Sequence, residues 1–208
     1  MKIHKIGFEF EILVKQKEFQ KVWDRIYKIS RHIRLGSDTS VRDGFGWKDL
    51  EIKTDPISEN RALLLFNKVL DLLTKLNSIG VIKTNKTCGL HVNISTENNI
   101  YTYFQIIEKY EDKKFLKLWN REKNPACLPL TFRENKKKYD NDPYEYLSLH
   151  RGQKYHSVAI RDADSLNGVR LENRIIGGKD YILRKEDLDE TIRDFLDTVK
   201  SGDTVYNN

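Results

Sequence analysis

The stretch Ile6-Gly7-Phe8-Glu9-Phe10-Glu11-Ile12 alternates strictly between apolar and other residues. In a β-strand successive side chains point to opposite faces, so the apolar residues share one face, while Gly7, Glu9 and Glu11 share the other. This is the clearest strand in the sequence. It predicts a sheet with one apolar face for packing and one face that carries carboxylates.

The size and composition of the chain indicate a single folded domain covering residues 1–208. Hydrophobic residues make up 38% of the 208 positions and charged residues 33%, which is ordinary for soluble globular proteins. The longest apolar stretch, Ala62 to Phe66, is far shorter than the roughly 20 residues that span a bilayer. Because the N-terminus also lacks the apolar core of a signal peptide, we expect no membrane association and a cytoplasmic location.

The net charge of +6 and the two cysteines restrict the chemistry only weakly. A positive field attracts polyanions, ATP included, but its sign does not identify a partner. The run Lys136 to Lys138 is more typical of a solvated loop than of a phosphate contact. Cys88 and Cys127 lack the CxxC spacing of a zinc or redox site, so both are expected to be free thiols.

Apolar residues at helical spacing predict four helices around the sheet. The run from Ala62 to Leu76 is long and apolar enough for a central buried helix, with Ser58 as a plausible N-cap and Gly80 as a plausible stop. The four predicted segments are Glu18 to Ile33, Ser58 to Gly80, Asn98 to Trp119 and Asp187 to Lys200.

Further strands follow from alternation and from turn residues. Trp47 to Thr54 is predicted to pair with Thr39 to Arg42, and Gly89 to Ser95 is another strand. Tyr155 to Arg161 and Gly168 to Ile175 are predicted as an antiparallel pair. Between them and the third helix lies an irregular stretch with Pro125, Pro129 and Pro143, a candidate lid or substrate loop.

One face of the predicted sheet collects ionisable residues from several strands. An antiparallel sheet can leave a polar face in water for solubility alone. A face of that kind would contain lysine, threonine and serine as often as glutamate. The predicted face instead contains four glutamates and a histidine. Its ionisable members are Glu9, Glu11, Glu51, His91, Glu172 and Arg174.

Carboxylates this close together repel one another unless cations neutralise them. Glu9 and Glu11 are two residues apart on one strand, so their Cα atoms lie about 6 to 7 Å apart. Magnesium takes oxygen ligands and bridges carboxylates to phosphates, and manganese also accepts imidazole. Four glutamates and a histidine therefore fit two such ions.

Other chemistries explain this residue set less well. One histidine among carboxylates is a poor zinc site, and neither cysteine joins it. A retaining glycosidase uses paired carboxylates but has no need for the extra glutamates, the histidine and the arginine. A hydrolase based on Cys88 and His91 is weaker still, because residues three apart on a strand point to opposite faces.

These segments, in this order, resemble the amidoligase family of the carboxylate–amine ligase and glutamine synthetase superfamily. The resemblance spans nearly the whole chain, and its most specific part is the CGLHV sequence. Gly7 to Glu11 resembles the family's GxExE element, and Asp38 to Ser40 resembles its DxS element. Glu51 with Pro56 resembles the next acidic element. Cys88 to Asn93 resembles the CGLHVH element, and Glu172 to Arg174 resembles the ExR element.

The resemblance implies an α+β fold like the glutamine synthetase catalytic domain, with a curved, mainly antiparallel sheet and helices on its convex face. It also implies a ligand set for two or more Mg²⁺ or Mn²⁺ ions. The implied metal ligands are Glu9, Glu11, Glu51, His91 and Glu172.

The implied reaction is ATP-dependent amide formation through an acyl phosphate. Arg174 would contact the phosphate and Asp38 would hold or deprotonate the amine, although aspartate is also a common turn residue. The expected ATP contacts are Arg174, Arg170, Asn93 and Lys53. The expected partners are small-molecule or peptide carboxylates and amines, and the sequence does not indicate an oligomeric state.

Two departures and two alternatives accompany this prediction. Asn93 stands where the family commonly has a second histidine, and the chain has little beyond the sheet and its helices. A phosphotransferase could use the same site and stop at phosphoryl transfer. A basic nucleic-acid-binding module is disfavoured, because a floor of glutamates repels phosphate backbones.

Overall fold

A computed structural model describes residues 3–41, 43–96, 109–125, 127, 129, 157–161 and 170–201 of the chain. Its centre is a seven-stranded antiparallel sheet in the order β2-β3-β1-β5-β7-β6, with β4 paired to part of β1. The strands are β1 (Ile3–Lys15), β2 (Ile33–Gly36), β3 (Trp47–Thr54), β4 (Ile82–Lys83), β5 (Leu90–Thr96), β6 (Val158–Arg161) and β7 (Arg170–Asn173).

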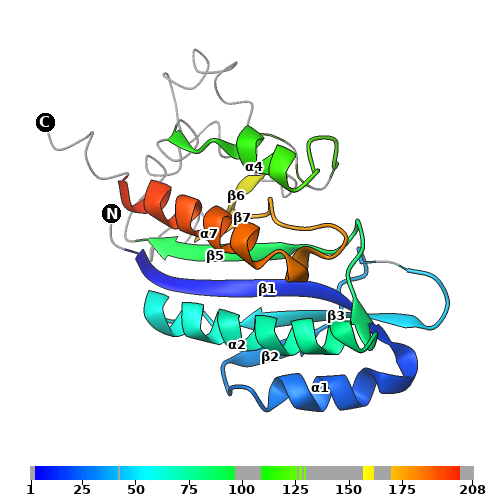
Figure 1. Cartoon of the computed structure of the whole chain (residues 1–208). Coiled ribbons are helices and arrows are strands. Elements are labelled where there is room, and N and C mark those ends of the chain that lie inside the picture. Colours follow the sequence, from blue (N-terminus) through cyan, green and yellow to red (C-terminus); the bar gives the residue numbers. More distant parts are fainter. Residues whose placement is uncertain are drawn as a thin grey trace, which may run out of the picture.

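Two long helices cover the apolar face of this sheet. Figure 1 shows α2 and α7 running roughly along the strands, with α1 at the β2 end of the sheet and α4 at the β6 end. The helices are α1 (Phe19–Tyr27), α2 (Glu59–Ser78), α4 (Asp112–Leu118) and α7 (Lys185–Lys200), with short 3-10 turns η1 (Gln16–Glu18) and η2 (Tyr181–Leu183) before α1 and α7.

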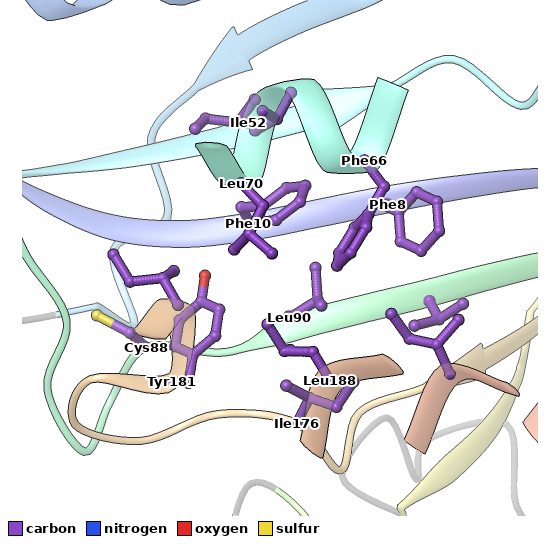
Figure 2. Packing of buried hydrophobic residues seen from close by; sticks show 14 of the residues in the cluster. Phe8, Phe10, Ile52, Phe66, Leu70, Cys88, Leu90, Ile176, Tyr181 and Leu188 are labelled. Carbon is purple, nitrogen blue, oxygen red and sulfur yellow. The ribbon is translucent and has the colours of Figure 1, made fainter. Parts of the chain in front are cut away.

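The alternation of β1 decides which face becomes the core. Ile6, Phe8, Phe10 and Ile12 are all fully buried. Figure 2 shows Phe66 of α2 against the two β1 rings, and its ring centroid lies 4.9 Å from that of Phe8 and 5.5 Å from that of Phe10. The polar face is therefore left for the carboxylates.

The α+β class, the antiparallel pairing and most of the predicted elements are confirmed. The helix after Ser58 ends at Ser78 with Ile79 as its C-cap, and Gly80 adopts a left-handed φ of 67°, as expected for a residue that follows a helix end. The described residues contain no helix long and apolar enough to cross a membrane.

Two predicted boundaries are wrong, and both errors have the same cause. The first helix ends at Tyr27 and not at Ile33, because Ile33 begins β2 and pairs with Thr54. β2 is therefore the partner of β3, whereas Thr39 and Ser40 form a turn. The pairing of Ile33 with β3 outcompetes a helical repeat that continues through it.

Several predictions lie outside the described residues. They concern residues 98–108 of the third predicted helix, Lys136 to Lys138 and Pro143. The prediction of one helix through to Trp119 is wrong, because Tyr110 and Glu111 are not helical and α4 runs from Asp112 to Leu118.

Candidate functional site

The register of the sheet brings the predicted site residues into rows across the polar face. Glu11 of β1 faces Glu51 of β3, and Glu9 lies between Lys53 on one side and His91 on the other. On the next row Asn93 faces Glu172 of β7. Four strands, β1, β3, β5 and β7, thus contribute to one surface, which we call the carboxylate face. Its ionisable members are Glu9, Glu11, Glu51, Lys53, His91 and Glu172.

One group of carboxylates forms where β1 and β3 meet the loop after β2. Glu11, Asp38 and Glu51 each offer a carboxylate oxygen, and these atoms all lie within 4.8 Å of one another. The Asp38 side chain accepts a hydrogen bond from the backbone N–H of Ser40 at 2.8 Å, so a turn holds it in place. Asp38 is therefore both a turn residue and a member of the site.

A second group surrounds the imidazole of His91. Nδ1 lies 3.6 Å from Glu9 Oε2 and 3.7 Å from Glu172 Oε1, whereas Nε2 lies 3.6 Å from Glu11 Oε1. The side chain is buried, and Nδ1 has no hydrogen-bond partner among the residues that the structure describes. His91 therefore stands between the two groups of carboxylates, with a polar atom that needs a partner.

Asn93 and its neighbours connect the second group to the β7 end of the sheet. The Asn93 amide donates to Glu9 Oε1 at 2.9 Å and accepts from Arg170 Nη1 at 3.1 Å. Lys53 pairs with Glu51 at 2.8 Å. Of the predicted ATP contacts, Asn93 and Lys53 thus pair with acids of the carboxylate face, and Arg170 pairs with Asn93.

Arg174 follows β7 directly and is mostly buried beside the face. Its Nη1 contacts Glu172 Oε1, and its Nε has no hydrogen-bond partner within the described part of the chain. Its backbone N–H donates to Ser157 at 2.8 Å, which ties it to the start of β6. The backbone of Arg174 is therefore tied to the start of β6, and its guanidinium lies beside Glu172.

The electrostatics of the face divide its acids into two kinds. Burial raises the pKa of Glu11 and that of Glu51 above their ordinary value. Burial also raises the pKa of Glu9, but His91 outweighs it and leaves this pKa lowered. For Asp38 the hydrogen bonds from Ser40 outweigh burial in the same way, so its pKa is lowered. A cation near Glu11 and Glu51 would favour their ionised forms.

These residues fit a divalent ion with oxygen ligands. Two ligands of one magnesium ion stand about 3 to 4.2 Å apart, because the bonds are about 2.1 Å long and the coordination is octahedral. The 3.6 and 3.7 Å separations around His91 fall in that range, although they are too long for hydrogen bonds. The unpartnered His91 Nδ1 suits a metal that accepts imidazole, such as manganese.

One residue of the site is absent from the sequence-based prediction. Arg121 is only 6% exposed, and its Nη1 donates to the carbonyl of Ile176 at 2.9 Å. Both this Nη1 and Glu11 Oε2 lie within 3.3 Å of the point where a Cβ on Gly89 would stand. A single arginine in a charged stretch gives no sequence signal, and only the tertiary structure places it beside Glu11.

Comparisons with known proteins add no assignment. Neither the protein-family models nor the curated proteins include a match to this chain. The carboxylate face and the motifs that compose it are therefore the features that indicate a function.

Proposed function

We propose that this protein is an ATP-dependent carboxylate–amine ligase whose carboxylate face binds Mg²⁺ or Mn²⁺. The observation that carries the proposal is the position of His91, whose unpartnered Nδ1 faces Glu9 and Glu172 and whose Nε2 faces Glu11. The resemblance to the amidoligase motifs supports the same reading. A fold related to the catalytic domain of glutamine synthetase belongs to this proposal, although the sheet is uncurled and not curved as expected.

The residues divide into two metal-binding groups. Glu11, Asp38 and Glu51 would hold one ion, and Glu9, His91 and Glu172 would hold another. Bound ions of this kind bridge phosphate oxygens and neutralise charge that builds on the transferred group. Asp38, which the motif resemblance assigns to the amine, joins the first group here.

The remaining polar residues would position the substrates. Arg174 would contact the γ-phosphoryl group of ATP as it moves to a substrate carboxylate, and its cation would stabilise the developing charge. The amine would then displace phosphate from the acyl phosphate to give an amide. Asn93 would keep Glu9 and Arg170 oriented throughout.

The decisive experiment incubates the protein with ATP, Mg²⁺ or Mn²⁺, and panels of carboxylates and amines. A ligase releases ADP and inorganic phosphate in step with amide formation, and hydroxylamine traps its acyl phosphate as a hydroxamate. ADP release without phosphate release, together with a stable phosphorylated product, would identify a phosphotransferase. The absence of both acceptor-dependent turnover and metal binding would refute the proposal.

Matched variants connect the activity to the carboxylate face. Glu11→Gln removes one charge from the first group and is expected to abolish turnover. Glu190→Gln removes the same charge from the outer side of α7, where the side chain is 51% exposed, and should leave activity unchanged. Full activity of the Glu11 variant would refute the metal assignment.

A further inference from the structure

A second arginine reaches the edge of the carboxylate face from outside the predicted motifs. Arg121 follows α4, and the turn that ends this helix positions Arg121 at the edge of the carboxylate face. The Arg121 N–H donates to Leu116 at 2.8 Å and the Asn120 N–H to Lys117 at 3.1 Å. Asn120 has a left-handed φ of 53°. This is the Schellman arrangement that ends many helices, with asparagine in place of the usual glycine.

Two facing glycines provide the space that the Arg121 guanidinium occupies. Gly89 and Gly177 form an isolated antiparallel bridge beside Glu11. A Cβ on Gly177 would stand 1.9 Å from Arg121 Nη1 and 2.7 Å from the Cys88 carbonyl. Any larger residue at this position would therefore displace the guanidinium or the backbone.

The hydrogen bonding of Arg121 and Arg174 is incomplete in the same way. The Nε of each is buried and has no hydrogen-bond partner among the described residues. Most buried donors in proteins are paired, and an unpaired donor on a buried cation is especially costly. Arg184 is a useful contrast, because its Nε pairs with Asp187 at 2.7 Å and its Nη2 with the Leu118 carbonyl at 2.9 Å.

Arg121 and Arg174, the two arginines whose Nε lacks a partner among the described residues, lie at the same end of the site. Arg121 Nη1 is bonded to Ile176, two residues beyond Arg174, and the charges of the two arginines interact with each other and with Glu11. Two guanidinium groups at one end of a site can together offer donors to the several oxygens of a phosphate. A carboxylate has fewer oxygens to offer.

We propose that Arg121 and Arg174 together bind an oxyanion of the phosphate class at the end of the carboxylate face beside Gly89 and Gly177. Binding of the anion itself does not depend on the ligase activity. The identification of that anion with the phosphoryl group of ATP does rest on the proposed function.

The test measures binding of inorganic phosphate to the full chain by isothermal titration calorimetry and by ³¹P line broadening, with and without Mg²⁺. Arg121→Met is expected to weaken phosphate binding at least about tenfold, because one of the two cations is lost. Arg121→Lys should recover part of the affinity, since it keeps the charge but loses the planar donor set. Arg184→Met, the matched control, should bind phosphate like the wild type.

Arg174→Met serves as the second variant if Arg121→Met does not fold, because Arg174 is the less buried of the two, with 15% of its side chain exposed. Phosphate binding that is equal in wild type and both variants would show that water satisfies these donors, and would overturn the proposal. Binding of acetate in preference to phosphate would overturn the phosphate class. Phosphate binding without any ligase turnover would leave this inference standing while the proposed function fails.

Discussion

His91 Nε2 lies 3.6 Å from Glu11 Oε1, which makes the imidazole the link between the two groups of carboxylates. The strand register produces this relationship, because it pairs His91 with Glu9 and places Glu11 one step further along the same face of β1. A substitution of His91 should therefore alter both groups of carboxylates.

Replacement of His91 by alanine is expected to weaken Mn²⁺ binding at least about tenfold, because changes even in the partners of metal ligands cost 10- to 100-fold in affinity. Electron paramagnetic resonance of free Mn²⁺ measures the affinity. His32→Ala is the control, since this side chain is 36% exposed and pairs with Asp55. Equal Mn²⁺ affinity in the His91 variant and the wild type would exclude His91 as a ligand.

Asn93→Asp tests the hydrogen bonds across the face. The change removes the donor to Glu9 and adds a carboxylate beside Glu9 and Glu172. We expect a loss of about 1 to 3 kcal/mol in the free energy of unfolding, the usual cost of leaving a buried polar group unpaired. Urea denaturation measures it, and Mn²⁺ should restore part of the loss. A variant as stable as the wild type without metal would contradict this role.

Stability should depend on pH and metal together. Burial raises the pKa of Glu11 and of Glu51 above the ordinary 4.5, so the folded chain holds these protons more tightly than the unfolded chain. Their contribution to stability is present at low pH and is lost as the pH rises through the folded pKa. Glu9 and Asp38, with lowered pKa, act in the opposite direction.

A metal ion removes the cost of ionising Glu11 and Glu51. The increase in Tm caused by saturating Mn²⁺ should therefore be largest near neutral pH and should vanish as the pH falls toward 4.5. Differential scanning calorimetry across the pH range measures this. An increase in Tm that does not change with pH would refute the assignment of these two carboxylates.

The turn after α4 can be tested without touching the site. Asn120 adopts a left-handed φ, so Asn120→Ala should cost about 1 kcal/mol of stability, whereas Asn120→Gly should be neutral or stabilising. Chemical denaturation compares the two variants. If both have the same stability, the left-handed turn does not hold this segment.

The aromatic cluster under β1 is the expected centre of stability. Phe66→Ala removes a fully buried ring that packs against Phe8 and Phe10, and should cost about 3 to 5 kcal/mol. Leu64 lies on the outer side of the same helix and is 64% exposed, so Leu64→Ala should change stability by less than about 0.5 kcal/mol. Urea denaturation measures both values, and similar losses would show that the core lies elsewhere.

Local periodicity was enough to predict β1, β3, β5 and α2, together with the face on which each polar residue lies. The period-two pattern of Glu9 and Glu11 determines their common face before any partner strand is known, because neighbouring side chains of a strand must alternate. The separation of apolar and ionisable residues in this sequence therefore already implies a carboxylate face.

Tertiary structure decided the rest, because contacts between distant segments have no local signature. Ile33 continues the helical repeat of the sequence, but in the structure it pairs with β3 and belongs to a strand. The turn at Asp38 brought its carboxylate to Glu11 and Glu51, and the helix end at Asn120 placed Arg121 beside Gly89. The pattern of residues determines which face is polar, but only the packing of the whole chain determines which charges meet on it.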